Sequence, residues 1–443
     1  MDNNLTKRHD AKSLLLFAMP TIIMMVFMSL YTMVDGIFVA NFVSPDALAG
    51  LNLVIPSLSV LCSLAVLISA GGSVVISRKL GEGKNTEAQE DLSLIVLLTV
   101  AFGVIVTALA LVFADPILKV LGTTDNLYSV AHAYFQTLSM FVVPCLLQVQ
   151  FQYFFVTAGA PSLGLICVVA GGVSNVILDY VFIVSLDMGI RGAAMATGIG
   201  YSIPAIVGLV WFFRNRSGML HFVKPRFRMS TLTESTINGV ASMIINMAGA
   251  TVTWLYNRVI ILYLGEIGIA AATVVLYARF MFNSVLSGYS SGVAPVISFN
   301  YGKQDFDQVK LLFRTSLKAV FAASALVLGV SVVFSDGIVA LFASGEPELA
   351  ALARRGIMLF SLSYLFNGVN TFAATMFSSL NNGKLSAVMA SLNTFVFMTG
   401  SMFLLPALGL GADGVWLAVP AAECLSLFLT VFLLKKYQNT YHY

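Results

Sequence analysis

The chain has 443 residues, of which 58% are hydrophobic and only 10% are charged, and its formal net charge is +3. This apolar share exceeds that of soluble domains, and the sequence repeats stretches long enough to cross a bilayer. The composition therefore excludes a soluble domain and predicts an all-α polytopic membrane protein.

Twelve transmembrane spans are expected, some longer than the roughly 20 residues that a perpendicular helix needs. They cover residues 14–39, 47–77, 92–113, 127–156, 162–185, 189–213, 236–264, 267–299, 311–334, 355–379, 385–406 and 412–434. Pro20, Pro56, Pro144, Pro204 and Pro420 lie inside spans and are expected to kink or locally open them. The first apolar run is too long for a signal peptide, so it is expected to remain as a span.

Lys and Arg residues predict the orientation of these spans. Seventeen of them fall on the side that carries both termini, and four, Lys119, Arg191, Arg354 and Arg355, fall on the other. By the positive-inside rule, both termini are cytoplasmic. The basic segment 214–235 is expected to be a cytoplasmic linker close to anionic lipid headgroups, and no nucleic-acid partner is expected.

The chain is also predicted to contain two copies of one six-span unit. At a constant shift of 221 residues, two motifs recur: Gly71, Val75, Ile76, Ser77 and Gly81 as Gly292, Val296, Ile297, Ser298 and Gly302, and Phe113, Asp115 and Ile117 as Phe334, Asp336 and Ile338. One register kept across several elements indicates duplication. The expected domains are an amino-terminal bundle, 1–213, the linker 214–235, and a carboxyl-terminal bundle, 236–443. Because six spans return the chain to the cytoplasm, a pseudo-twofold axis along the membrane normal should relate the bundles.

Acidic residues inside the apolar runs are the main functional signal, because a charge there needs a partner, a proton or a cation. Asp35 is expected about one turn below the outer face, and Asp179 about two turns below it, with Asn175 on the same helix face. Thr197 lies at a matching depth in the next span. These oxygens suit either Na⁺ or a shared proton. The alternative is that both carboxylates only hydrogen-bond neighbouring helices or line an outer vestibule.

The second half carries Arg279 and Glu423 at equal depths in their spans, which makes them a candidate structural ion pair. The alternative is a direct role in drug binding or proton movement. Tyr31, Gln148 and Gln152 are candidates for a substrate cavity, although each is equally suited to interhelical hydrogen bonding. The four cysteines have no paired spacing, so neither a disulfide nor a metal site beyond the possible Na⁺ is expected.

The sequence resembles a known family at several of these positions. Twelve spans in two repeats, Pro20 fifteen residues before Asp35 in Met-Val-Asp-Gly-Ile-Phe-Val, and the Asn175, Asp179 and Thr197 spacing are similar to the multidrug and toxic compound extrusion (MATE) family. The resemblance covers essentially the whole chain and points to the bacterial branch of DinF-like and MepA-like exporters. It implies a V-shaped pair of bundles that exports amphipathic, often cationic compounds in exchange for H⁺ or Na⁺ across the bacterial cytoplasmic membrane.

In that branch the cation site lies in the amino-terminal bundle, and the resemblance carries it onto Asp35, Asn175, Asp179 and Thr197. It also implies a bend of the first helix near Pro20. Spans 236–264 and 355–379 contain no Asp or Glu, so a carboxyl-terminal cation site of the kind found in other branches is not expected. The expected protein is a monomer with drug and lipid partners, no cofactor and no enzymatic activity. The alternatives are a flippase for a lipid-linked precursor and an intramembrane enzyme with Asp35 and Asp179 as a dyad.

Overall fold

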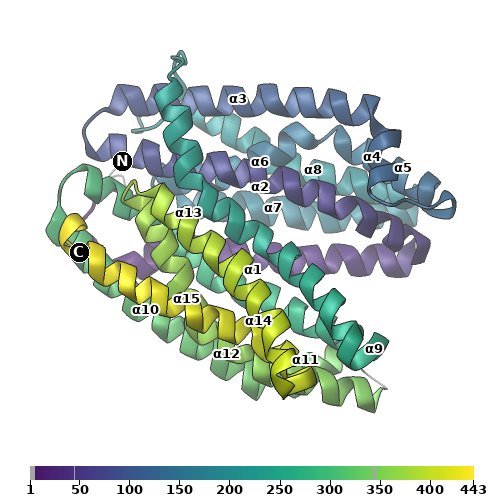
Figure 1. Ribbon diagram of the computed structural model, residues 1–443. Coiled ribbons are helices and arrows are strands. Elements are labelled where there is room, and N and C mark those ends of the chain that lie inside the picture. The colour runs from purple at the N-terminus through teal and green to yellow at the C-terminus, as the bar shows by residue number, and fades with distance from the viewer. Residues whose placement is uncertain (1–4, 44, 343–345) are drawn as a thin grey trace. The chain divides into compact units, whose positions relative to one another are not determined.

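The computed structural model of the chain describes residues 5–43, 45–342 and 346–443. Within these residues it does not describe the side chains of 33–37, 39–41, 45, 46, 48, 49, 250, 341 and 342. The described residues form helices and connecting segments, and no strand occurs among them (Figure 1).

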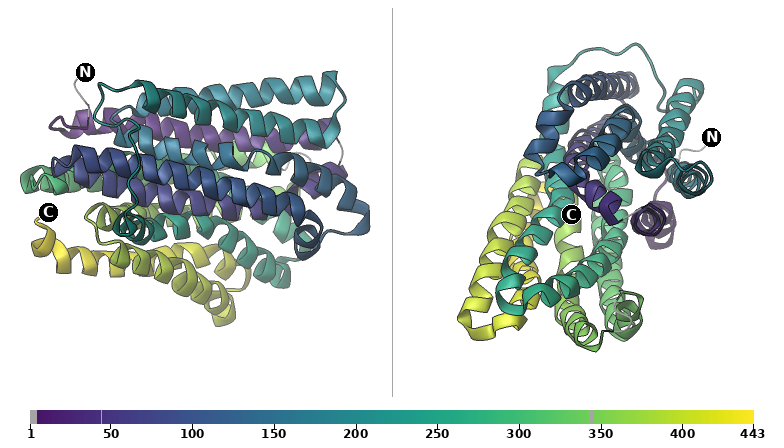
Figure 2. Two further views of the ribbon diagram at one scale, coloured as in Figure 1. Left: turned by 90° about the horizontal axis from the view of Figure 1, so that it is seen from above. Right: turned by 90° about the vertical axis from the view of Figure 1, so that its right-hand side faces the viewer.

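The first half contains α1 (Ala11–Phe42), α2 (Pro45–Gly81), α3 (Asn85–Val112), α4 (Ala114–Val120), α5 (Asp125–Ser139), α6 (Val142–Thr157), α7 (Pro161–Asp179), the π-helical segment η1 (Tyr180–Ser185) and α8 (Gly189–Arg214). The second half contains α9 (Met229–Gly302), α10 (Phe306–Val333), α11 (Ser335–Phe342), α12 (Pro347–Ser379), α13 (Gly383–Ser391), η2 (Leu392–Phe397), α14 (Met398–Leu405), η3 (Pro406–Leu410) and α15 (Gly411–Tyr441). Within each half, long helices run alongside one another, as Figure 2 shows from two sides.

Nine helices of the described chain are long and apolar enough to cross a membrane, and the pair α5 and α6, bent by 58°, makes a tenth. Two of the nine, α9 with 74 residues and the run Gly383–Tyr441 with 59, each hold two predicted spans. The number of spans is therefore the predicted twelve. The break before α6 lies near Pro144, whose missing N–H removes a helical hydrogen bond at that point.

The break inside α9 occurs at a glycine. Gly265 has φ +62° and ψ −154°, a conformation that side chains disfavour, and it separates the two spans predicted on either side of it.

The repeat extends to short helices that the sequence did not predict. The recurring Phe-x-Asp-x-Ile motif forms α4 in the first copy and α11 in the second.

Close packing divides the chain into two compact units. Unit 1 comprises the described residues up to Lys7 together with Ile23–Gly239, and unit 2 comprises Arg8–Ile22 and Val240–Tyr443. The predicted domains placed the whole first span in the first bundle, whereas packing places residues 8–22 in unit 2. The pseudo-twofold axis between the bundles stays a prediction.

Small residues explain why the start of α1 packs in unit 2. A Cβ at Gly288 would lie 2.8 Å from the Cα of Ile22, and one at Gly292 would lie 3.2 Å from the Cα of Ala18. Unit 1 has the matching contact, since a Cβ at Gly71 would lie 1.7 Å from the carbonyl oxygen of Ser235. Gly71 and Gly292 are the same position of the repeat. Each unit therefore places a glycine where the first helix of a repeat crosses at close range.

The linker is shorter than predicted, because α8 ends at Arg214 and α9 already begins at Met229. It is attached to α3 of the same unit. Gln89 donates its side-chain amide to the carbonyl of Met219 at 2.9 Å, and the N–H of Val223 donates to the hydroxyl of Ser93 at 3.0 Å.

Candidate functional site

The candidate ion site is built on one face of α7. Gly171, Asn175 and Asp179 follow one another at intervals of four residues, so they lie on one side of the helix. A Cβ at Gly171 would lie 2.6 Å from the carbonyl oxygen of Gly200 on α8. Glycine at this position lets the two helices approach closely and brings the polar residues of α7 against α8.

The neighbouring helix supplies Thr197. The Nδ2 of Asn175 lies 3.5 Å from the hydroxyl oxygen of Thr197, which itself donates to the carbonyl of Ala193 at 3.0 Å. Asn175 is 1% exposed, and its Oδ1 is buried without a hydrogen-bond partner in the described chain. An unused carbonyl oxygen in a buried polar cluster is an acceptor available to a cation or a proton donor.

Asp179 is fully buried at the last residue of α7, directly before the π-helical segment η1. Such segments are rare and recur at functional sites, because they change the direction of side chains within a helix. Asp35 lies in α1, but its side chain is outside the part of the chain that the structure describes. The structure therefore brings Asn175 and Thr197 together, with Asp179 one turn further along the same face of α7.

The chemistry of this group follows from its burial. A carboxylate removed from water favours protonation or binding of a cation, and nearby neutral oxygens can complete the coordination of a small hard ion. The site offers oxygen donors from a carboxylate, an amide and a hydroxyl. The described residues contain no group of three or more His, Cys, Asp or Glu side chains arranged to hold a metal ion.

The predicted cavity residues occupy packed positions. Gln148 and Gln152 on α6 are each 5% exposed, and the amide of Gln152 approaches the sulfur of Met28 on α1 at 3.3 Å. Tyr31 is half-buried and lies against α7, because a Cβ at Gly172 would be 3.6 Å from its ring. Tyr31 is thus one turn from Asn175 along the α1–α7 contact, which places it beside the candidate ion site.

Arg279 and Glu423 line one cavity in unit 2, but no salt bridge joins them. The Glu423 carboxylate instead accepts from the side-chain amides of Asn370 at 2.8 Å, Asn367 at 2.9 Å and Asn393 at 3.3 Å. Amide donors solvate the buried carboxylate, so it needs no direct contact with the guanidinium. None of these asparagines was singled out in the sequence. Their spacing in α12, Asn367 and Asn370 on adjacent turns, was the available signal.

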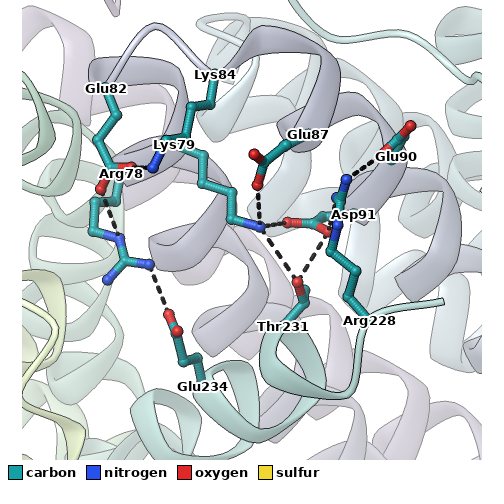
Figure 3. Close-up of polar contacts among 10 residues, drawn as sticks. All are labelled: Arg78, Lys79, Glu82, Lys84, Glu87, Glu90, Asp91, Arg228, Thr231 and Glu234. Atoms are coloured by element: carbon teal, nitrogen blue, oxygen red, sulfur yellow. Dashed lines mark hydrogen bonds and ion pairs between the residues drawn. The ribbon is translucent and has the colours of Figure 1, made fainter. Parts of the chain in front are cut away.

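Sequence reasoning also missed a charged network at one end of unit 1 (Figure 3). Asp91, fully buried on α3, receives Lys79 from α2, Arg228 at 3.2 Å and the Thr231 hydroxyl at 3.0 Å. Arg228 also pairs with Glu90. Burial alone would lower the pKa of Arg228, but attraction to Glu90 and Asp91 outweighs it and raises that pKa.

A separate group of ion pairs lies near this network (Figure 3). Arg78 donates to Glu234 at 2.7 Å and lies 3.4 Å from Glu82.

A second unexpected contact joins Cys62 and Cys145. Their sulfurs lie 3.7 Å apart as free thiols, although 83 residues separate them in the chain. The sequence spacing of the cysteines gave no signal for this contact.

The model of the MatE family matches two segments of the chain, residues 20–181 and 239–402. The segments are almost equally long and begin 219 residues apart, close to the repeat shift, so the match itself occurs twice. Together they cover well over half of the sequence. The chain belongs to the MatE family. The resemblance to the MATE transporters that the sequence suggested is thereby confirmed, and with it an all-α membrane transporter of two six-helix bundles.

Curated relatives match the MatE chain over nearly its full length. The multidrug export protein MepA of Staphylococcus aureus (strain bovine RF122 / ET3-1) is 24% identical over 434 residues, covering 96% of this chain and 94% of MepA. MepA of Staphylococcus haemolyticus (strain JCSC1435) is 23% identical and covers 97% and 94%.

Solved structures support the fold. The outward-facing structure of a multidrug resistance MATE family transporter of the MOP superfamily has a TM-score of 0.93 at 20% identity, covering 100% of this chain and 99% of that one. A MOP superfamily transporter from Pyrococcus furiosus, described as having a binding pocket of reversed polarity, has a TM-score of 0.92 at 19% identity with the same coverage. At these identities the likeness establishes the fold alone.

Proposed function

We propose that this MatE protein is a secondary active exporter of amphipathic, often cationic compounds, driven by antiport with H⁺ or Na⁺ through alternating access. Membership of the MatE family and relatives named multidrug export proteins support the transported class. The observation that carries the coupling is the fully buried Asp179, one turn from Asn175 and its contact with Thr197. A carboxylate at that place exchanges its proton or cation only when access to it changes.

The coupling site in this proposal consists of Asp35, Asn175, Asp179 and Thr197. Ion binding there competes with a cationic substrate for the same negative charge, so that entry of the ion from outside releases the substrate outward. Tyr31 lies against α7 near this site and serves the substrate side of the exchange. Gln148 and Gln152 are proposed to face the substrate only in another conformation, since they are buried here.

The membrane arrangement belongs to the same proposal. The protein lies in the bacterial inner membrane with both termini cytoplasmic, as the distribution of Lys and Arg predicts. Pro20 is proposed as the hinge of the first helix. In support, α1 changes from unit 2 to unit 1 between Ile22 and Ile23, within one turn of that proline. Proline weakens the helix at this point because its ring replaces a backbone N–H.

The test is efflux of the cationic dye rhodamine 123 from proteoliposomes under an imposed proton gradient and, separately, a sodium gradient. We expect one gradient to drive efflux in the wild type and Asp179→Asn to reduce it at least about tenfold, as expected when an essential ion-binding charge is lost. The matched control is Asp187→Asn. Asp187 is exposed, lies eight residues away and has φ +52°, which asparagine also adopts.

Two results would contradict the proposal. Equal efflux by wild type and Asp179→Asn under the active gradient would remove the coupling site from α7. No gradient-driven dye movement by the wild type would reject the exporter and favour the flippase, which a lipid-linked cargo assay would then test. If Asp187→Asn retains dye efflux and Asp179→Asn loses it, the result supports both the export function and the proposed coupling site.

A further inference from the structure

Unit 2 contains a polar cavity that the coupling site does not use. Its empty space is about 600 Å³, part of which is open to solvent. It is lined by α9 on both sides of Gly265, by α12 and α15, and by the segment that runs from α13 through η2 to α14. The charged groups that line it are Arg279 and Glu423, and asparagines form much of the remaining polar wall.

Glu423 is fixed in place as the negative group. Its side chain is 2% exposed, and its carboxylate accepts from three asparagine amides. Asn370 also donates to the backbone carbonyl of Glu423 at 2.9 Å and accepts from the Thr430 hydroxyl at 2.9 Å. Donors on several sides hold the carboxylate group in one orientation.

Arg279 is the positive group, and it is differently placed. It is partly exposed to the cavity and takes part in no hydrogen bond or salt bridge within the described chain. A guanidinium carries five donors in a planar fork that fits a carboxylate. Asn393 lines the same cavity, and its Oδ1 is buried and has no partner among the described residues. The cavity therefore offers free donors on Arg279, a free acceptor on Asn393 and the fixed charge of Glu423.

This arrangement discriminates between ligands by charge. A simple cation is repelled by Arg279, and a simple anion is repelled by Glu423, in surroundings where water screens poorly. A ligand that carries both signs leaves the net charge of the cavity unchanged and can satisfy both groups. We propose that this cavity binds the zwitterionic head of an amphipathic substrate, with its carboxylate on Arg279 and its cationic group toward Asn393 and Glu423.

The inference rests on the proposed export function, and a binding assay without any gradient separates the two. Rhodamine 110 carries a free carboxylate, and rhodamine 123 is its methyl ester, so the pair differs only in that group. Fluorescence anisotropy of each dye with purified full-length protein in detergent gives the two dissociation constants. We expect wild type to bind rhodamine 110 more tightly. We expect Arg279→Gln to weaken the binding of rhodamine 110 about tenfold, the size of one charge-assisted hydrogen-bonded pair. Binding of the cationic rhodamine 123 should not weaken, because the variant removes a charge that repels it.

Two further variants keep the test decisive. Arg258→Gln is the matched control, because Arg258 lies on the same helix, is exposed and contacts the Trp254 ring at 5.9 Å, outside this cavity. Arg279→Lys retains the charge without the planar guanidinium and should weaken rhodamine 110 binding by an intermediate amount. This variant also serves if Arg279→Gln misfolds.

If Arg279→Gln weakens the binding of both dyes equally, the role of Arg279 is structural and the proposal is overturned. The proposal would also be overturned if the wild type fails to bind rhodamine 110 or binds rhodamine 123 more tightly. Dye efflux that Asp179→Asn abolishes would still uphold the export function in that case.

Discussion

The two repeats differ in the corner where the second and third long helices of each repeat meet. Unit 1 has a buried ion pair there, whereas the matching buried positions of unit 2 hold an amide and a leucine, and unit 2 has the more exposed ion pair of Arg8 with Asp305 at 3.3 Å. At the shift of 221, Lys79 and Asp91, which pair inside unit 1, correspond to Asn300 and Leu312 in unit 2. The Asn300 amide donates only to the carbonyl of Val296 on its own helix, at 2.8 Å. A buried ion pair in one copy is thus replaced by an amide and a leucine in the other.

A second pair of positions shows the same replacement. Glu87, which lies 3.3 Å from Lys79, corresponds to Gln308, whose amide donates to the carbonyl of His9 at 2.7 Å. Both residues lie on the third long helix of their repeat, and both make a contact at this corner. It meets a lysine in unit 1 and the chain leading into α1 in unit 2.

What the two corners share is close backbone contact at glycine. Gly71 meets Ser235 and Gly239 in unit 1, and its counterpart Gly292 meets Ala18 in unit 2. The glycine contact occurs in both units, whereas the buried ion pair occurs only in unit 1 among the described residues. The comparison teaches that small residues determine this corner, and that the ionic network is an addition in one copy.

The largest effect is expected from filling the glycine contact. In Gly239→Leu the new Cβ would lie 1.7 Å from the carbonyl oxygen of Leu67, so the helices must separate. The cost should exceed the roughly 1–3 kcal/mol of ordinary overpacking and abolish folding. Size-exclusion chromatography of the detergent extract measures the folded yield. Gly249→Leu is the control, because nothing lies within 4 Å of its new Cβ. A monodisperse Gly239→Leu protein at wild-type yield would contradict the conclusion that close glycine contact determines this corner.

An intermediate effect is expected from breaking the network of unit 1. Asp91→Ala leaves Lys79 buried without its main partner and should destabilise the protein by about 3–5 kcal/mol. The double variant Lys79→Asn/Asp91→Leu copies the residues of unit 2 and should recover more than half of that loss. Thermal unfolding in detergent measures both. If the double variant is as unstable as the single one, the charges are required and the amide and leucine of unit 2 are no guide to unit 1.

The smallest effect is expected in unit 2. Gln308→Ala removes one hydrogen bond to the carbonyl of His9 and should cost about 1 kcal/mol. The same thermal assay compares it with Lys310→Ala, an exposed position on the same helix. A loss as large as that of Asp91→Ala would show that the corner of unit 2 depends on its polar contacts as strongly as that of unit 1 does.

Local sequence determined much of this protein, because lipid requires long apolar helices and leaves few alternatives. Span number, the duplication, the break near Gly265 and the resemblance to MATE transporters all followed from hydrophobic length, glycine and a constant shift. Helical spacing also predicted that Asn175 and Thr197 lie close together, and the two side chains lie 3.5 Å apart in the structure.

Which side chains meet across helices could not be predicted, because packing sets the rotation of each helix about its axis, and sequence patterns do not. Arg279 and Glu423 are predicted at equal depth, but asparagines from α12 and η2 donate to the carboxylate. Asp91 receives Lys79 and Arg228 from distant segments, and residues 8–22 pack in unit 2 through glycine contacts that hydropathy does not reveal. The sequence therefore predicts the helix and the depth of each polar group, whereas its partners follow from how the helices pack.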